Sequence, residues 1–144
     1  MKYLKKFNEK LNLKDRTELL DFCETTLAYL IDERFSIDCT FTNVRDGVIK
    51  IDLEKVDGFN QRSSFLWDDV KDYYIPFLQL LNNRYDIIPY GNRTKNNVCF
   101  DTFFHEAYFS VEDVIADRVK DFNGDEFGHK DKTHCISVKV KEKK

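Results

Sequence analysis

Residues 121–130, DFNGDEFGHK, look at first like the beginning of a calcium-binding loop, because Asp121, Asn123 and Asp125 alternate as the first three ligands of an EF-hand would. An EF-hand loop beginning at Asp121 also needs a glycine at its sixth position and a glutamate at its twelfth. Those positions hold Glu126 and Lys132, so the sharp turn and the bidentate carboxylate are both missing. We therefore interpret the stretch as the end of a helix, with Asn123-Gly124 supplying the left-handed residue that helix C-termini often use.

A zinc site is a second candidate, because His129, His134 and Cys135 lie close in sequence and Cys99 or His105 could complete a tetrahedron. Structural zinc sites usually take their ligands in closely spaced pairs such as CxxC, and the chain has no such pair. His134 and Cys135 are neighbours at the start of an expected strand and should point to opposite faces. We interpret the histidines as loop residues, and metal binding by His129 or His134 stays undecided.

Other catalytic motifs are incomplete. His105 begins an HExxH-like motif, but Phe109 stands where the second histidine should be. The carboxylates of Asp68, Asp69 and Asp72 fall in the first turns of an expected helix, where they favour the helix dipole rather than acid–base chemistry. Neither GxxxxGK[ST], GxGxxG nor GxSxG occurs in the chain. We expect no enzymatic activity, no catalytic residue and no cofactor.

The net charge of −3 conceals basic ends and an acidic body. Residues 1–14 carry five lysines against one glutamate, and residues 139–144 carry four lysines against one glutamate. Residues 15–138 hold the other 14 basic and 24 acidic residues, a balance of −10. Lysine-rich ends could contact nucleic acid or another acidic partner. The lysines that would make such contacts are Lys2, Lys5, Lys6, Lys139, Lys141, Lys143 and Lys144.

The bulk composition predicts one domain, because 144 residues with 42% hydrophobic content can bury a substantial core. No apolar run approaches the roughly 20 residues that cross a bilayer, and the opening MKYLKKFNEK has no secretory hydrophobic region. We expect a cytoplasmic setting and no contact with a membrane. The four cysteines have no CxxC pair, so we interpret them as buried thiols: Cys23, Cys39, Cys99 and Cys135.

Hydrophobic periodicity predicts the elements of the first half of the body. A helix should begin at a capping box of Asp15 and Glu18 and end near Glu33. Residues 35–41 and 49–53 alternate as two half-buried strands of a hairpin. A type I turn with Gly47 left-handed would close a three-residue loop, which sets Phe41 opposite Ile51.

The second half should begin with a long helix over residues 67–83 that continues, kinked, through Pro76. A short strand should follow, and then a strand over residues 98–104 that is covered on both faces. Ser110 should start a third helix that continues to about Phe122. In the last strand Ile136, Val138 and Val140 alternate with Ser137, Lys139 and Lys141, so this strand is predicted to be exposed or at a sheet edge.

These elements predict a single α+β domain over residues 1–144. An antiparallel-rich sheet should carry two long helices and a shorter third helix on one face, in the order α-β-β-α-β-β-α-β. We expect residues 1–12 to form a short amphipathic segment, because their apolar side chains have helical spacing, and residues 13–144 to form the body.

The opening MKYLKKFNE resembles the start of many small uncharacterised proteins of large tailed bacteriophages. LAYLIDERFSI and FLWDDVKDYYIPFLQLL are similar to blocks in small phage proteins of that kind, where a helix leads into a strand and an aromatic-Trp-Asp segment opens a proline-containing helix. These blocks cover about the first 85 residues. The resemblance implies a phage or phage-derived origin and action in a bacterial cytoplasm or a virion. It brings no activity and no site residue.

We expect a small non-enzymatic module that binds a protein partner, either through residues 1–12 or by adding the last strand to a partner's sheet. The alternative is a nucleic-acid-binding accessory protein that uses the lysine-rich ends, which must then lie on one face. A metal-dependent enzyme is the third hypothesis and needs His129 and His134 to converge with Cys99 or His105. Neither the partner's identity nor the oligomeric state follows from the sequence.

Overall fold

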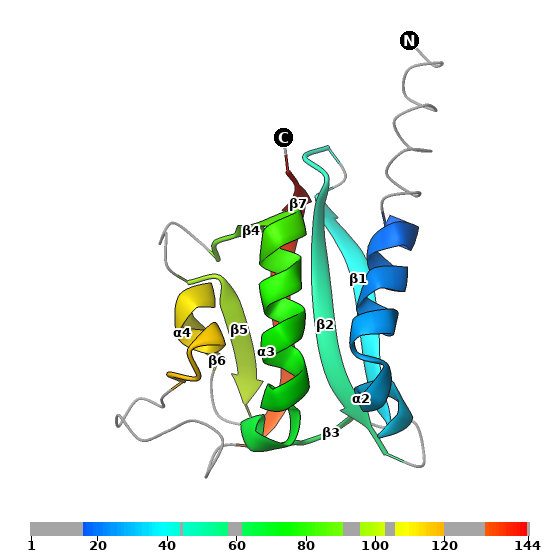
Figure 1. Cartoon of the computed structure of the whole chain (residues 1–144), viewed down its shortest axis with the longest axis vertical. Helices are drawn as coiled ribbons and strands as arrows, with labels where there is room; N and C mark the ends of the chain where they lie inside the picture. Colours follow the sequence, from blue (N-terminus) through cyan, green and yellow to red (C-terminus); the bar gives the residue numbers. More distant parts are fainter. Residues whose placement is uncertain are drawn as a thin grey trace.

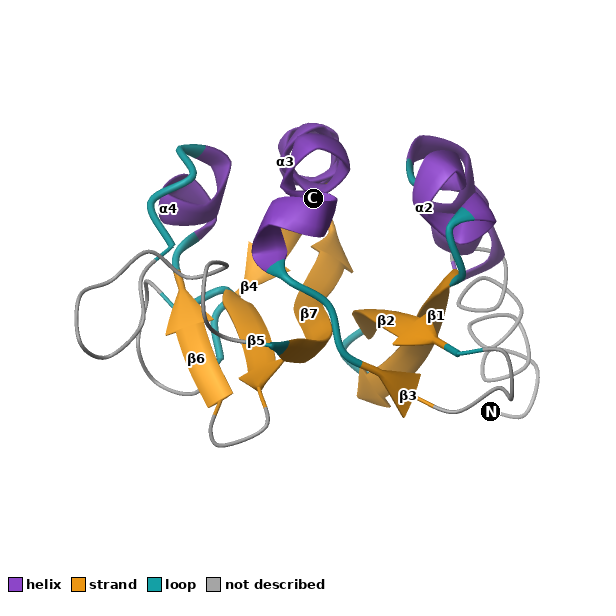
Figure 2. Ribbon diagram, turned by 90° about the horizontal axis from the view of Figure 1, so that it is seen from below, coloured by secondary structure: helices purple, strands orange, loops and turns teal. Residues whose placement is uncertain are grey.

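The computed structural model describes residues 16–43, 45–57, 62–90, 96–102, 106–119 and 132–143. These residues form one antiparallel sheet (Figure 1) with the helices in a single layer on one side of it (Figure 2). The α+β class and the one-sided helix layer that the sequence predicts are therefore confirmed.

The sheet has the strand order β1-β2-β7-β5-β6, with β3 beside β2 and β4 beside β7. The sequence pattern predicts neither the two-residue β3 nor the four-residue β6. The predicted two-sided burial of β5 is confirmed, because all but one of its five residues are buried. The strands are β1 (Phe35–Asn43), β2 (Val48–Val56), β3 (Arg62–Ser63), β4 (Tyr85–Ile88), β5 (Val98–Thr102), β6 (Glu106–Phe109) and β7 (Thr133–Glu142).

The hairpin of β1 and β2 has the predicted faces but not the predicted partners. Phe41 lies opposite Ile49, whereas a three-residue loop would place it opposite Ile51. The predicted register is wrong by two residues: four residues rather than three separate the paired Asn43 and Val48, and the bulge between Phe41 and Asn43 adds one more residue to β1. An even shift leaves the same side chains on the core face. Gly47 has the predicted left-handed conformation, with a φ of +69°.

The last strand, β7, lies in the middle of the sheet, with β2 on one side and β4 and β5 on the other. The prediction of an exposed or edge strand is therefore wrong. Ile136, Val138 and Val140 are buried in the core; between them, Ser137 is also buried and Lys139 is partly covered. Lys139 and Lys141 do not require an exposed strand, because long lysine stems can lie along a covered surface while the ammonium group reaches water.

The helix layer begins with residues 16–26, which lead through a turn at Leu27 into α2 (Ala28–Asp32). The hydroxyl of Thr26 donates to the carbonyl of Phe22 at 2.7 Å, a bond of the kind that often bends helices. The predicted cap at Asp15 lies outside the described residues.

The second long helix, α3 (Trp67–Arg84), contains Pro76 and is continuous across it, which confirms that part of the sequence prediction. The carboxylate of Asp69 accepts from the backbone N–H of Leu66 at 3.0 Å, so the acidic first turn caps the helix as expected.

The third helix, α4 (Val111–Ile115), starts where predicted but is shorter. The hydroxyl of Ser110 accepts from the backbone N–H of Asp113 at 3.1 Å and caps the first turn. The chain then leaves the helix, and Asp117 adopts a left-handed φ of +56°. The prediction that this helix ends within residues 121–130 is therefore wrong, and that stretch lies outside the described residues.

The core between sheet and helices is built around Trp67. Its ring meets Phe100 of β5 edge-on at 5.4 Å and Tyr74 of α3 edge-on at 6.0 Å between ring centroids. Such aromatic pairs contribute about 0.5–1.5 kcal/mol each beyond the burial of their area. Because these three side chains come from both layers, they fix the position of α3 over the sheet.

The outer edge of β1 is protected by Arg16. The backbone N–H of Val56 donates to the carbonyl of Arg34 at 2.9 Å, so even-numbered residues of β1 bond to β2 and odd-numbered ones face outward. One outward carbonyl, that of Cys39, accepts a hydrogen bond from Nε of Arg16 at 2.7 Å. A cationic side chain at an edge strand discourages pairing with another chain.

Replacement of Gly47 by alanine should lower the free energy of unfolding by about 1–2 kcal/mol. The cause is backbone strain alone, because Gly47 has a φ of +69° and an added Cβ would meet no atom within 4 Å. Gly47→Asn should cost less, because asparagine tolerates this conformation. Urea unfolding followed by Trp67 fluorescence measures both variants, and equal losses for both would contradict this explanation.

Candidate functional site

The lysines expected to bind nucleic acid are only partly described, and two of the three described ones, Lys139 and Lys143, make contacts within the protein. The ammonium group of Lys139 lies 4.6 Å from the centroid of the Tyr90 ring. Lys143 donates to the carbonyls of Asn82 and Asn83, at 3.3 and 3.1 Å, at the end of α3. Cations at a helix C-terminus stabilise its dipole. Lys2, Lys5, Lys6 and Lys144 lie outside the described residues.

A cavity of about 420 Å³ opens where the first helix, the hairpin tip and the end of α3 meet. Its walls carry both signs of charge, with Arg45, Arg84, Lys141 and Lys143 mixed among Glu18, Asp46 and Glu142. Lys141, one of the expected contact residues, lies here. Because the opposite charges are interspersed, the cavity favours no particular class of ligand.

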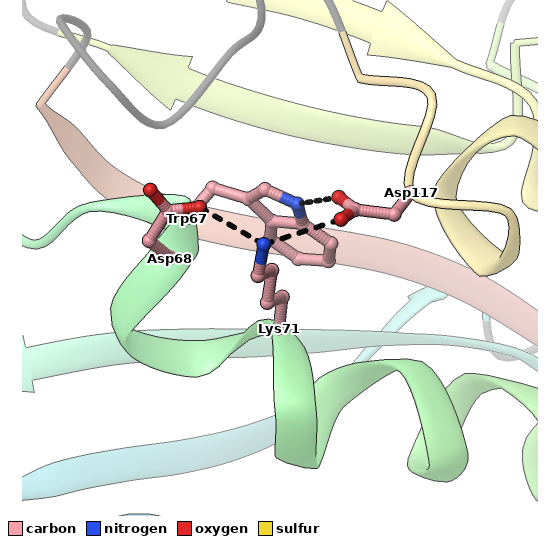
Figure 3. A network of polar contacts seen from close by, with 4 residues as sticks. All are labelled: Trp67, Asp68, Lys71 and Asp117. Atoms are coloured by element: carbon pink, nitrogen blue, oxygen red, sulfur yellow. Dashed lines mark hydrogen bonds and ion pairs between the residues drawn. The ribbon is translucent and has the colours of Figure 1, made fainter.

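A polar network at the start of α3 joins four side chains (Figure 3). The indole N–H of Trp67 donates to Oδ1 of Asp117 at 2.7 Å. Lys71 lies between Asp117, at 3.2 Å, and Asp68, at 3.3 Å. Both carboxylates raise the pKa of Lys71, so it stays protonated and suits no role as a general base. The network ties α3 to the end of α4, which is a structural role.

All four cysteines are free and buried, which confirms their interpretation as core thiols. Burial, with a contribution from Glu106, raises the pKa of Cys99 to about 11. A hydrogen bond with Cys39, followed by burial, raises the pKa of Cys23. Because the thiolate is the reactive form, these thiols are poor nucleophiles at neutral pH.

No group of three or more His, Cys, Asp or Glu side chains in the described ranges is arranged to hold a metal ion. His134 and Cys135 occupy adjacent positions of β7, while His105 and His129 lie outside those ranges. The helices of the described part are also too short or too polar to cross a membrane.

An exposed apolar surface lies on the helix layer, and we call it the aromatic patch: Tyr29, Tyr73, Pro76 and Leu80. The rings of Tyr29 on α2 and Tyr73 on α3 stack at 4.4 Å, with an angle of 13° between their planes. Tyr29, Tyr73 and Leu80 are 53%, 36% and 48% exposed, and Pro76 is exposed beside them. Tyr73, Pro76 and Leu80 share one face of α3 because they are three and seven residues apart.

The surroundings of the aromatic patch are acidic. Residues 16–34 and 67–84 contain eight Asp or Glu and four Lys or Arg, a balance of −4. The pKa of Tyr73 is raised by partial burial and by a hydrogen bond with Tyr29, and the carboxylates of Asp72 and Glu33 add to this effect. The local field therefore disfavours negative charge at the patch.

No protein-family model, no curated protein and no solved structure matches this chain significantly. No homologue supplies a site residue, and the aromatic patch is selected by exposure, geometry and charge alone.

Sequence reasoning missed the aromatic patch. Tyr29, Tyr73 and Leu80 fall between the apolar positions that define the buried stripes, and this off-stripe placement is the available signal. The stacking of two tyrosines that are 44 positions apart depends on how α2 and α3 pack, which periodicity does not specify.

Replacement of Asp117 by glycine should lower the free energy of unfolding by about 1–3 kcal/mol, because it leaves the indole N–H of Trp67 without its acceptor. Glycine accommodates the left-handed φ of this residue, so the loss measures the carboxylate rather than the backbone. Asp117→Asn, which keeps an acceptor, should cost less. Urea unfolding measures both, and an unchanged midpoint for the glycine variant would contradict this role.

The four thiols should react with a small disulfide reagent at pH 8 about 100-fold more slowly in the folded protein than in denaturant. For Cys99 the reason is a pKa raised to about 11, which keeps the thiol protonated. The pKa of Cys99 is higher in the folded protein than in the unfolded chain. The contribution of this thiol to the free energy of unfolding therefore falls as the pH rises from its pKa in the unfolded chain towards about 11. Absorbance of the released leaving group gives the rate. Rapid modification of one thiol in the folded protein would contradict the prediction.

Proposed function

We propose that this protein is a small non-enzymatic interaction module that binds a protein partner through the aromatic patch. The observation that carries the proposal is the exposure of Tyr29, Tyr73 and Leu80 side by side on the helix layer. These are three of the five large hydrophobic side chains exposed in the described ranges. Contiguous exposed apolar surface marks interaction sites, and tyrosine is enriched among the residues that dominate binding energy.

Helix-face binding is better supported than strand addition. The central position of β7 removes the last strand as a donor to a partner's sheet. At one outer edge of the sheet, Arg16 already occupies the carbonyl of Cys39. The other expected contact segment, residues 1–12, lies outside the described residues.

Nucleic-acid binding through the lysine-rich ends is the less supported alternative. Lys139 is engaged by the Tyr90 ring and Lys143 by the carbonyls at the end of α3, so both have roles within the fold. The acidic helix layer would also repel a phosphate backbone.

The resemblance of the opening residues and of two later blocks to small phage proteins supports a further part of the proposal. We place the origin in a phage or a phage-derived element, with action in a bacterial cytoplasm or in a virion.

Affinity capture tests the proposed function. The tagged full-length chain is incubated with a lysate of its native host or of infected cells, with and without nuclease, and bound proteins are identified by mass spectrometry. We expect a specific protein that survives nuclease and falls about tenfold or more in recovery with a Tyr73→Ala/Leu80→Ala variant. Both side chains are exposed, so the fold should persist.

Ile31→Ala is the matched control, because Ile31 is 37% exposed on α2 but is not part of the aromatic patch. This variant should retain the partner. Recovery of nuclease-sensitive material alone would overturn the proposal in favour of the lysine-rich ends. Undiminished recovery with the patch variant would show that binding occurs elsewhere.

A further inference from the structure

We infer that the aromatic patch takes a basic amphipathic helix of a partner protein, with an arginine stacked on the tyrosine pair. This inference rests on the proposed function, because it names the chemistry of the partner for the same surface. It is drawn from three features of that surface: its charge, its aromatic geometry and its shape along α3.

The charge of the helix layer selects a cationic partner. Of its four basic residues, three are engaged within the protein: Lys71 with two carboxylates, Arg84 over the ring of Phe22 at 4.9 Å, and Arg16 with a backbone carbonyl of β1. Exposed carboxylates lie on both helices, at Asp21, Glu24, Asp32, Glu33, Asp69 and Asp72. A partner's lysines and arginines would therefore meet complementary charge around the apolar centre.

The tyrosine pair favours arginine over lysine at the centre of the contact. Tyr29 and Tyr73 stack on each other, so each ring covers one face of the other, and the 53% and 36% of their surface that stays exposed can offer an outer face or an edge. A planar guanidinium stacks on such rings by cation–π attraction and carries less hydration than an ammonium group. Pro76 lacks an N–H, so the carbonyl of Asp72 is left without its usual helical donor. This carbonyl lies one turn before Pro76, close to the aromatic patch.

The shape of the aromatic patch fits a helix. Tyr73, Pro76 and Leu80 extend along two turns of α3, which is about 10 Å, and Tyr29 widens the surface towards α2. Two turns match the i, i+3 or i+4, i+7 spacing with which an amphipathic helix presents its anchors. An extended strand would instead seek a row of free backbone groups, whereas a helical surface pairs its own, apart from the single carbonyl of Asp72.

Peptide binding to the full-length chain tests the inference. The probe is a synthetic helical peptide of about five turns, with leucines on one face and arginines and lysines on the other. One comparison peptide carries glutamates in place of all the basic residues, and a second replaces the arginines by lysines. Isothermal titration calorimetry at low and at physiological salt gives the affinities. Trp67 is buried, so its fluorescence reports the fold independently.

We expect the basic peptide to bind, the acidic peptide to bind at least about tenfold more weakly, and the lysine peptide to fall between them. Raising the salt concentration should weaken the binding of the basic peptide several-fold. Tyr73→Ala should reduce its affinity about tenfold, and the pair Glu33→Gln/Asp72→Asn should reduce it several-fold, whereas Ile31→Ala should leave it unchanged.

Equal binding of acidic and basic peptides, or undiminished binding by Tyr73→Ala, would overturn the inference. The chain could instead associate with itself, and this association could disappear with Tyr73→Ala and with removal of residues 1–12. A second copy of the chain would then be the occupant, and this outcome would also overturn the inference. If no peptide binds while the lysate partner is still lost with the patch variant, the partner chemistry is wrong and the interaction function stands. If neither experiment depends on the patch, the proposed function fails as well.

Discussion

The packing of α3 across the middle of the sheet is the interaction on which the rest of the structure depends. Only one side of the described sheet carries helices, and α3 lies over its centre in that layer (Figure 2). Its buried face presents Trp67, Val70, Tyr74, Phe77, Leu78 and Leu81 to the core. Because burial of apolar area is the main favourable contribution to folding, the placement of both neighbouring helices follows from this contact. The opposite face of α3 remains available to carry an exposed surface.

The sequence predicts those elements whose apolar positions repeat with a clear period. Residues 67–84 form the expected helix through Pro76, because the apolar stripe leaves no alternative face for burial. The alternation of β1 and β2 gives the correct buried faces, while the bulge after Phe41 changes which residues are opposite each other. A bulge depends on local backbone geometry and sheet twist, and hydrophobic alternation carries no information about either.

The predictions from sequence are wrong where one hydrophobic pattern fits two different structural environments. Alternating lysines in β7 suit an exposed strand, and they equally suit a central strand whose lysines extend along one face towards water. The apolar residues after α4 suit a longer helix, but Val119 reaches the core from a non-helical segment beyond Asp117. The aromatic patch depends on contacts between elements distant in sequence, so composition and spacing could not predict it.

The position of β7 has a consequence for the newly synthesised chain. Among the described strands β7 is the last to leave the ribosome, yet it alone joins β1-β2 to β5-β6. While residues beyond α4 are still being added, β2 and β5 each present an inner edge with unpaired backbone groups. At this stage nascent chains can pair with one another through these edges, and molecular chaperones would bind the same exposed edges. Completion of the sheet then coincides with the arrival of one central strand, which makes the final folding step cooperative and strongly non-local.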